Sequence, residues 1–409
     1  MKSDPPTAAR RLYMDNAATS FPKPPAVHQA MMRYATELGA SPGRGAYAEA
    51  REAGRLMQVC RQRVNTLLHG DPGKPEQVIF TLNTTDSLNI AIRGITWAHF
   101  ALTHLITTDL DHNSVLRPYN ALCRHDHIQQ TRVPVDPSTG LVDPDDIRKA
   151  IRPDTRLIAV VHGSNVTGTL QPIREIGRIA REHDVPFLVD AAQTLGHVPI
   201  DVEADNIDLL AAPGHKGLLG PLGTGVLYIR PGIEQRMTTI REGGTGSVSE
   251  RDTQPDFLPD RFEPGSHNAI GIIGLAEGVA WVLNKGVDQL WQHEQDLIRV
   301  MIDGLTETGE TPGLSYFGPQ GVKHRCGVFS VRIEGVQHPQ ALSDILEQEY
   351  GILTRSGIHC APLAHQTLGT HTLGGTTRFS FGPFLSKQDV KYACDALGQI
   401  CHREACSLK

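Results

Sequence analysis

A lysine and an aspartate follow two stretches that predict buried strands. Lys216 stands in the run Gly214-His-Lys-Gly217, shortly after the apolar segment 207–211, and Asp190 closes the apolar segment 185–189. A lysine amine can hold the aldehyde of a cofactor, and a buried carboxylate can keep a pyridine nitrogen protonated. Taken singly, each has an ordinary explanation, as a solvated lysine and a turn-forming aspartate. Together they indicate chemistry on a pyridine aldehyde.

Hydroxyl and imidazole groups follow other predicted strands. The run Asn83-Thr84-Thr85-Asp86 comes at the start of a helical pattern, where free backbone N–H groups favour a phosphate. His112 also follows a predicted strand, and its planar ring can stack on another ring. Thr84 could equally be only a helix cap, and His112 only a packed histidine. The ordered combination, with His215 beside Lys216, predicts a pyridoxal phosphate site.

One cysteine stands in a sequence typical of a loop. Cys360 follows Arg355-Ser-Gly-Ile-His and is close to Pro362 and His365. An exposed loop thiol near histidines ionises more readily than a buried one, and the thiolate is the nucleophile. The alternative is a buried structural thiol, which we expect for Cys60, Cys123 and Cys394.

The elements that carry these residues alternate between strands and helices. Apolar runs predict strands at 78–81, 104–108, 132–135, 157–161, 185–189, 207–211 and 225–229. An amphipathic helix is predicted over 172–184. We therefore expect an α/β fold, with a large domain whose mostly parallel sheet is flanked by helices. Ligands bind such sheets at the carboxyl ends of the strands, where the polar residues above are found.

After about residue 265 the pattern changes to that of a smaller α+β unit. Helices are predicted over 270–283, 287–305 and 339–350, and strands over 327–333, 352–355 and 376–380. The segment 243–264 is rich in Gly, Pro, Asp and Ser, and we expect an ordered excursion between the two parts.

Composition and charge exclude several classes of protein. The 409 residues include 39 Lys and Arg against 45 Asp and Glu, a formal charge of −6, so no basic field for nucleic acid or an anionic membrane is expected. No apolar run reaches the ~18 residues of a spanning helix, and the N-terminus lacks an apolar signal region. Seven cysteines in a long chain predict reduced thiols and a cytoplasmic location. Cys401, His402 and Cys406 lack four ligands at suitable spacing, so no metal site is expected.

Longer motifs join those above. They are Tyr13-Met-Asp-Asn-Ala-Ala-Thr-Ser20, Arg44-Gly-Ala-Tyr47, Glu263-Pro-Gly-Ser266, Arg355-Ser-Gly-Ile-His-Cys360 and Thr376-Thr-Arg378-Phe. With them the chain resembles, over nearly its whole length, the cysteine desulfurase branch of the class V aminotransferases, which are pyridoxal phosphate enzymes of fold type I. The resemblance implies a homodimer with its site near the subunit boundary.

The resemblance also implies three parts of the chain. Residues 1–20 would be an N-terminal segment that packs on the small domain. Residues 21–265 would form the large domain that binds the cofactor. Residues 266–409 would form a small C-terminal α+β domain that carries the cysteine loop.

Each site residue receives a role from the resemblance. Lys216 carries pyridoxal phosphate, Asp190 pairs with the pyridine nitrogen and Gln193 reaches the phenolic oxygen. His112 stacks on the ring and can shuttle protons. The phosphate is held by Thr84, Thr85, His215 and, from the other subunit, Ser266. The substrate is held by Asn16, Ala18, Asn165 and Arg378, the last two at its carboxylate.

Two positions depart from the family's usual pattern. Pro213 replaces a small or hydroxyl residue two positions before the His-Lys pair, which removes one phosphate donor. Asn83 stands where glycine is common. Both departures concern the phosphate ligands.

The implied activity is the conversion of L-cysteine to L-alanine. Cys360 would take the sulfur as a persulfide and pass it to an acceptor protein or a small thiol. The compact stretch from Arg355 to Arg378 is similar to the second group of desulfurases, which depend on a dedicated acceptor. A selenocysteine lyase or another C–S lyase would use the same residues. A class V aminotransferase or epimerase would not need Cys360, and a non-catalytic scaffold or sulfur-carrier partner would need none of them.

Overall fold

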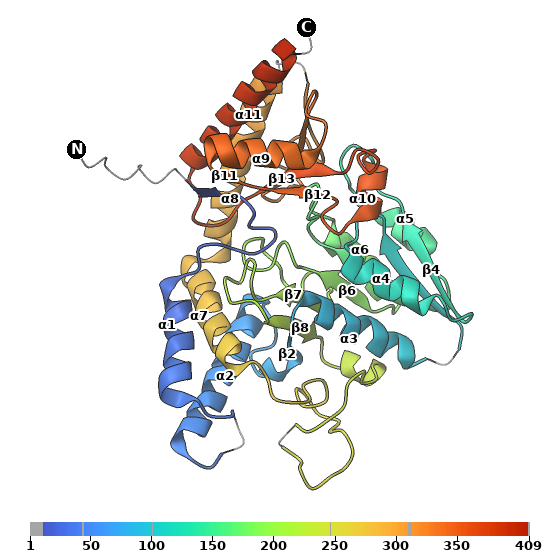
Figure 1. The fold of residues 1–409 in the computed structure, drawn as a ribbon. Helices are drawn as coiled ribbons and strands as arrows, with labels where there is room; N and C mark the ends of the chain where they lie inside the picture. Colours follow the sequence, from blue (N-terminus) through green and yellow to red (C-terminus); the bar gives the residue numbers. More distant parts are fainter. Residues whose placement is uncertain (1–10, 43–44, 100, 246, 310–312, 408–409) are drawn as a thin grey trace, which may run out of the picture.

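The centre of the molecule is a seven-stranded sheet of order β2-β8-β7-β6-β5-β3-β4 (Figure 1). In this computed structural model, which describes residues 11–42, 45–99, 101–245, 247–309 and 313–407, β3 to β7 pair in parallel. Only β8 runs against its neighbours in this sheet. The mostly parallel sheet confirms the predicted α/β fold class. In spatial order the strands are Val78–Thr81, Gly225–Ile229, Leu209–Pro213, Phe187–Asp190, Thr155–Val161, Thr103–Thr108 and Ile128–Val133.

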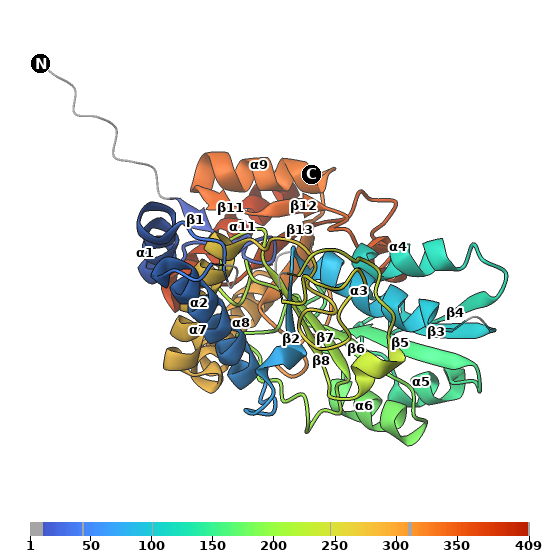
Figure 2. The same cartoon turned by 90° about the horizontal axis from the view of Figure 1, so that it is seen from below.

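Helices cover both faces of this sheet because successive strand residues point to opposite sides. Ile158 and Val160 pack in one core with helices α2, α5, α6 and α7, whereas Leu157 and Ala159 pack in another with α3 and α4. Figure 2 shows α3 and α4 on the side of the sheet opposite α5 and α6. These helices are α2 Ala48–Leu67, α3 Thr84–Trp97, α4 Asn113–Leu122, α5 Pro144–Ala150, α6 Ile173–Glu182 and α7 Ala269–Lys285.

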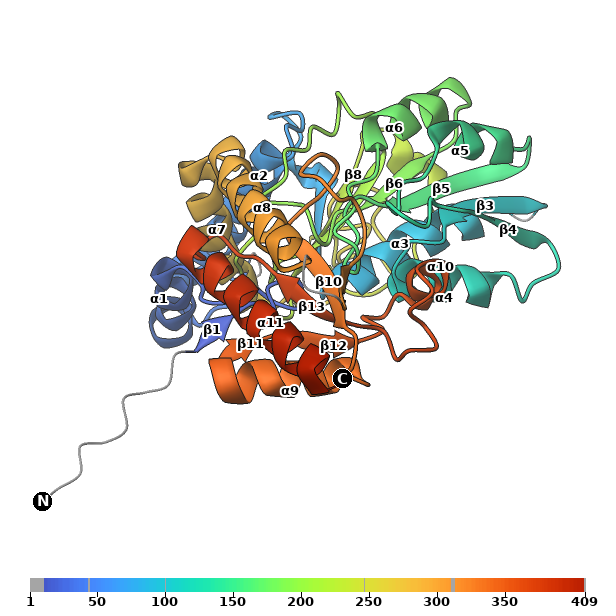
Figure 3. The same ribbon diagram turned by 90° about the horizontal axis from the view of Figure 1, so that it is seen from above.

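A second, smaller unit has its own antiparallel sheet of order β12-β13-β10-β9 and its own apolar core. Helices α8 and α11 lie side by side in Figure 3, and α9 packs beside β12 and β13. The elements of this unit are α8 Val287–Gly309, β9 Leu314–Tyr316, β10 Val328–Ile333, α9 Pro339–Tyr350, β11 Ile352–Leu353, β12 Arg355–Gly357, α10 Pro362–Thr367, β13 Thr376–Ser380 and α11 Lys387–Ser407.

The chain enters the fold through the smaller unit. Strand β1, Leu12–Tyr13, pairs with Ile352 and Leu353 of β11, and helix α1, Pro25–Arg33, then packs on α7. Short π and 3₁₀ turns at 34–38, 75–77 and 233–236 complete the elements. The predicted division at residues 20 and 265 stays a prediction. Helix α7 belongs to the predicted small domain by its residue numbers, but it packs in the core of the large sheet. Residues 1–10 of the predicted N-terminal segment and Arg44 lie outside the described residues.

One strand prediction is wrong in position. The strand expected at 132–135 is β4, Ile128–Val133, whose middle residues are exposed or half-buried polar side chains. Strand β4 is one of the two edge strands, and because its middle residues are not buried, its sequence lacks the apolar run that marks the buried strands. Among the described residues no single helix is long and apolar enough to cross a membrane, although the bent pair α7 and α8 passes that test by length and composition together.

Candidate active site

A cavity of ≈ 200 Å³ lies at the carboxyl ends of the parallel strands. We call it the central cavity. It is lined from the large unit by residues after β2, β3, β5, β6 and β7, and from the smaller unit by the segment around β12 and by β13. It brings together eleven of the predicted site residues, namely Ala18, Thr84, Thr85, His112, Asn165, Asp190, Gln193, His215, Lys216, Cys360 and Arg378.

Lys216 and Asp190 face this cavity from the loops after β7 and β6. The pKa of Lys216 is lowered to about 8, mainly by burial and also by the Arg378 guanidinium, whereas the Asp190 carboxylate acts in the opposite direction. Burial raises the pKa of Asp190 to about 6, despite a hydrogen bond that it accepts from the Ala192 N–H at 3.0 Å. The cavity therefore holds an amine that is easily deprotonated and a carboxylate that is ionised at neutral pH.

The proposed phosphate end is the N-terminus of α3. Asn83 caps this helix by accepting a hydrogen bond from the Asp86 N–H at 3.0 Å, and Thr84 and Thr85 are the first helical residues. The His215 ring lies opposite with its Nδ1 buried and unpaired among the described residues. Asn83 thus replaces the family's glycine with a cap, and the helix N-terminus still presents its free N–H groups to an anion.

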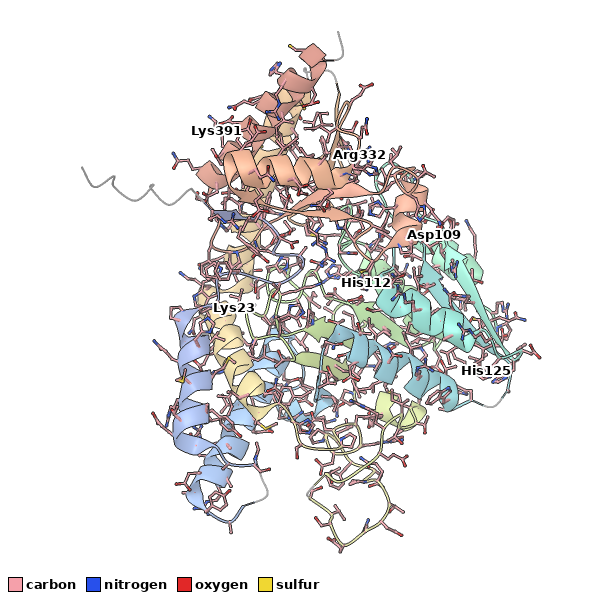
Figure 4. All side chains as sticks on the ribbon, in the orientation of Figure 1. Lys23, Asp109, His112, His125, Arg332 and Lys391 are labelled. Carbon is pink, nitrogen blue, oxygen red and sulfur yellow. The ribbon has the colours of Figure 1, made fainter. Side chains whose placement is uncertain are left out.

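His112 begins α4 and lies on the side of the large sheet that faces the smaller unit (Figure 4). Its Nδ1 accepts a hydrogen bond from the Ser114 N–H at 3.1 Å and lies 2.9 Å from Ser114 Oγ. Burial lowers the pKa of His112 to about 4, and the Lys216 charge acts in the same direction. The ring is therefore neutral at physiological pH, with Nδ1 as acceptor and the proton on Nε2.

Arg378 on β13 is the buried cation of the cavity, with 1% of its surface exposed. Its Nη2 donates to Asp15 Oδ1 at 2.7 Å, and its Nη1 donates to the Asn165 carbonyl at 3.2 Å. Its Nε is buried without a partner in the part of the chain that the structure describes. Burial lowers the pKa of Arg378, and Asp15 opposes that change. Asp15 thus holds the guanidinium in place, and these two hydrogen bonds use only two of its five N–H donors.

Gln193 and Asn16 differ in their positions. Gln193 lines the central cavity, and its Nε2 donates to the Ala17 carbonyl at 3.0 Å. Asn16 does not line this cavity. Its Nδ2 donates to the Ser380 carbonyl at 3.2 Å and its Oδ1 accepts from the Phe21 N–H at 3.2 Å. These contacts link the N-terminal segment to β13, and the substrate role of Asn16 stays a prediction.

Cys360 is exposed at the edge of the central cavity, in the turn before α10. Both His359 and Cys360 have left-handed backbones, with φ of 51° and 58°. Two hydrogen bonds tie the turn to the large unit: Asn165 Nδ2 donates to the His359 carbonyl at 2.6 Å, and the Asn113 N–H donates to the Cys360 carbonyl at 2.9 Å. The backbone of Cys360 is thus held beside the start of α4, where His112 also lies.

The histidines near Cys360 do not provide positive charge. His359 and His365 are buried, and burial lowers the pKa of His365 to about 4 and that of His359 well below its usual value. The expectation that they help the thiol to ionise is therefore wrong. The basic side chains that share the cavity with Cys360 are Lys216, Arg355 and Arg378.

The other cysteines are placed differently. Burial raises the pKa of Cys60 and of Cys394 to about 12. Cys123 is half-buried, so the expectation of full burial holds for two of the three cysteines named for it. No group of three or more possible metal-binding side chains occurs in the described ranges.

Sequence reasoning assigned no role to three residues that shape this site. They are Asp15, Ser114 and Arg355. Asp15 and Arg355 lie within the motifs Tyr13–Ser20 and Arg355–Cys360, so the sequence contained a signal that could have identified them. Nothing in the sequence marks Ser114 as a partner of His112 and Thr85, the latter at 2.8 Å. Ser266 is exposed and does not line the cavity, so its role across a subunit boundary stays a prediction.

These residues fit pyridoxal phosphate. An amine of lowered pKa suits its aldehyde, and an ionised buried carboxylate suits its pyridinium. The unpaired Nδ1 of His215 beside the N-terminus of α3 suits its phosphate. The site therefore has a partner for the aldehyde, the pyridine nitrogen and the phosphate of the cofactor.

The comparisons with known proteins agree with this geometry. The model of the family described as aminotransferase class-V matches residues 12–393. The chain therefore belongs to the class V aminotransferases, whose cofactor is pyridoxal phosphate.

Within that family the chain is similar to cysteine desulfurases. A probable cysteine desulfurase of Methanothermobacter thermautotrophicus is 32% identical over 98% of this chain and 97% of its own length. The apo structure of a cysteine desulfurase from Thermococcus onnurineus matches with a TM-score of 0.87 at 31% identity, covering 96% of this chain and 95% of that one. A cysteine desulfurase structure from Escherichia coli gives a TM-score of 0.83 at 27% identity, covering 95% and 94%. The fold type I architecture is thereby confirmed.

Proposed function

We propose that this protein is a cysteine desulfurase that converts L-cysteine to L-alanine and receives the sulfur on Cys360. The observation that carries the proposal is an exposed thiol at the edge of a cavity that also contains Lys216, Asp190 and Arg378. A class V aminotransferase or epimerase would have no use for that thiol. The relatives named as cysteine desulfurases support the same activity.

The residues divide the work of substrate binding and proton transfer. Arg378 binds the substrate carboxylate through guanidinium N–H groups that Asp15 and the Asn165 carbonyl do not use. When bound, pyridoxal phosphate withdraws electrons from the substrate and makes its Cα proton removable. Asp190 holds the pyridine nitrogen in its protonated form, and Lys216 as the neutral amine takes the Cα proton.

The sulfur step belongs to Cys360. Its thiolate attacks the substrate sulfur, forming an S–S bond while the Cβ–S bond breaks and its electron pair passes to carbon. Protonation of that carbon, and return of the proton from Lys216 to Cα, give alanine, and His112 Nε2–H is placed to take part in proton transfer. Cys360 is left as a persulfide, and its sulfur passes to an acceptor protein or a small thiol.

We further propose a homodimer in the cytoplasm. Phe21, Leu82 and Leu222 are large apolar residues exposed in segments next to site residues, which supports a partner surface there. The seven free cysteines support a reducing compartment. Sedimentation equilibrium tests the proposed homodimer, because a dimer has twice the 44.6 kDa of one chain. A monomer at micromolar concentration would contradict it.

The activity is tested with purified holoenzyme, L-cysteine and dithiothreitol. We expect alanine and sulfide in equal amounts from the wild type and neither product from Cys360→Ala, while both proteins absorb alike as cofactor-loaded enzymes. Full activity of Cys360→Ala would favour a lyase that expels sulfide directly. A parallel assay with L-selenocysteine separates a desulfurase from a selenocysteine lyase, because the latter would favour the selenium substrate.

A further inference from the structure

A second hollow meets the central cavity at Cys360. It measures ≈ 460 Å³ and runs over α3 and α4. We call it the outer groove. Its lining includes Thr85, Arg93, His112, Arg117 and Cys360. Because Cys360 lines both hollows, its thiol can meet the substrate on one side and a sulfur acceptor on the other.

The outer groove is basic, although the whole chain carries a formal charge of −6. Arg93 and Arg117 line it, and no carboxylate does so among the described residues. Asp86, on the same helix as Arg93, is engaged by Arg241 at 3.3 Å and by the Leu82 N–H at 3.0 Å. The groove therefore attracts negative charge to the side of Cys360 that faces away from the substrate.

The two arginines are held differently. Arg93 Nε donates to Asn89 Oδ1 at 3.0 Å, and its guanidinium stacks over Trp97 with 5.3 Å between the cation and the ring centroid. Arg117 is exposed and makes no hydrogen bond or ion pair with any residue that the structure describes. Arg93 is thus a fixed cation, and Arg117 is a charge available to a ligand.

The dimensions of the groove suit a piece of polypeptide. Thr85 and Arg93 are separated by about two turns of α3, or about 12 Å along the helix axis. An extended chain covers that distance in about four residues. A small thiol is shorter than this span and would occupy only part of it.

On this basis we propose that the outer groove binds an acidic, cysteine-bearing segment of the sulfur-acceptor protein. This inference rests on the proposed desulfurase function. The acceptor thiolate attacks the outer sulfur of the Cys360 persulfide, forming a new S–S bond while the bond to Cys360 Sγ breaks. Cys360 leaves as a thiolate and the acceptor becomes the persulfide, so no external oxidant or reductant is needed. Carboxylates beside the acceptor cysteine pair with Arg117 and Arg93.

The test compares three acetylated peptide amides as acceptors: Asp-Asp-Cys-Asp, Ser-Ser-Cys-Ser and Lys-Lys-Cys-Lys. Persulfide transfer from the cysteine-loaded holoenzyme is followed by alkylation and mass spectrometry. For the wild type we expect the acidic peptide to have the highest kcat/KM, with an advantage that falls as salt is added. Arg117→Gln should lower kcat/KM for the acidic peptide about fivefold and leave the serine peptide within about twofold.

Two controls make the outcome specific. Arg124→Gln, an exposed arginine in the turn after α4, should behave like the wild type with all three peptides. Dithiothreitol, a neutral thiol, should release sulfide at the same rate from the wild type and from Arg117→Gln. Comparing one peptide between variants removes the effect of the neighbouring charges on the reactivity of the peptide thiol.

Several results would overturn the proposal. If the acidic peptide is no better than the serine peptide, or if Arg117→Gln slows all acceptors equally, the groove does not select acidic segments. If Arg117→Gln instead changes the dimerisation constant, the groove is covered by a second copy of the chain. If the wild type forms no alanine even with dithiothreitol, the proposed function itself fails, and this inference fails with it.

Discussion

Lys216 and Asp190 share one cavity, and burial moves their pKa values toward each other. The amine is lowered to about 8 and the carboxyl is raised to about 6. Burial disfavours both charged forms, and the attraction between the two groups only partly offsets it. Lys216 therefore yields a neutral amine at mildly alkaline pH, which is the form that attacks an aldehyde.

The first prediction concerns cofactor uptake by the apoprotein. The rate at which Lys216 captures pyridoxal phosphate should rise with pH through a midpoint near 8, because the neutral amine increases through its pKa. Asp190→Asn should move that midpoint down, since the Asp190 charge stabilises the ammonium form. Stopped-flow absorbance from pH 6 to 10 measures this, with N-acetyl-lysine methylamide as the control for the cofactor's own ionisation. A midpoint near the ordinary lysine value of 10.5 would contradict the account.

The second prediction concerns Asp15, which holds Arg378 at 2.7 Å. Asp15→Asn should raise KM for L-cysteine about tenfold and change kcat by less than about twofold, because a positioned guanidinium contributes to carboxylate binding. Steady-state kinetics on holoenzyme separates the two constants. Asp145→Asn, an exposed position on α5, is the matched control. Loss of kcat with KM unchanged would show that Asp15 acts elsewhere in the reaction.

For single residues, the sequence predicts which side chains form the site better than it predicts which groups those side chains contact. Lys216, Asp190 and His112 each follow a strand, so the rule that ligands bind at strand ends predicts that they meet. Asn16 and Asp15 are neighbours in one motif, yet the structure places Asp15 beside Arg378 and turns Asn16 toward Ser380. That difference depends on the pairing of the N-terminal segment with the smaller unit, which lies more than three hundred residues away in the chain.

Among the elements, the loop before α7 is tied to the large sheet by a buried ion pair. Arg61 on α2 donates to both carboxylate oxygens of Glu263 at 2.7 and 2.9 Å, and Glu263 also accepts from the Phe80 N–H at 2.6 Å. Both side chains are almost fully buried. The pair therefore fixes the segment that leads to Ser266.

The third prediction follows from this pair. Glu263→Ala should lower the free energy of unfolding by about 3–5 kcal/mol, because it leaves the Arg61 charge buried without its partner. Urea unfolding of the apoprotein, followed by circular dichroism, measures the change. Glu52→Ala removes a surface partner of Arg55 and should leave the unfolding midpoint almost unchanged. Equal effects of the two substitutions would contradict the structural role of Glu263.

Apolar runs locate the strands that are buried on both faces, with bounds that differ by up to two residues. The predicted strands 78–81 and 225–229 have the observed bounds of β2 and β8, because such strands are continuous apolar runs. Strand β4 has exposed or half-buried polar residues in its middle and was misplaced. The direction of β8 was not predicted, since the apolar run looks the same whichever way the strand runs.

At the scale of the whole molecule, a partly buried pair of side chains joins the two units. His197 Nδ1, from the segment after β6, lies 2.5 Å from Glu294 Oε2 on α8, and Glu294 Oε1 accepts from the Gly327 N–H at 2.6 Å. Burial acts to lower the pKa of His197, but the Glu294 charge and hydrogen bond outweigh it, so the pKa is raised. The pair braces the unit that carries Cys360 and Arg378 against the one that carries Lys216.

The fourth prediction is a pH-dependent loss of stability. A raised folded-state pKa means that the His197 contribution is complete below the unfolded value of about 6.5 and is lost as pH rises through the folded value. Glu294→Gln should therefore cost about 1–3 kcal/mol at pH 6 and clearly less at pH 9. Denaturant unfolding at the two pH values measures this. A cost that grows with pH would contradict the assigned charge state.

The arrangement of the two units was predictable only in part. The change of pattern near residue 265 predicts a second unit, and the structure shows a separate core there. Helical periodicity shows that α7 has an apolar face but not which core receives it, and α7 packs on the large sheet. The partner of a helix depends on the path of the chain in space, which local sequence does not record.

The central claim is that Cys360 takes the substrate sulfur, and one measurement tests it most directly. Holoenzyme is mixed with one equivalent of L-cysteine per chain without any acceptor thiol, quenched, and analysed by peptide mass spectrometry alongside alanine quantification. The account predicts one added sulfur on the Cys360 peptide, none on the other cysteines, and one alanine for each persulfide formed. Alanine without a persulfide on Cys360, or a persulfide on a different cysteine, would contradict it.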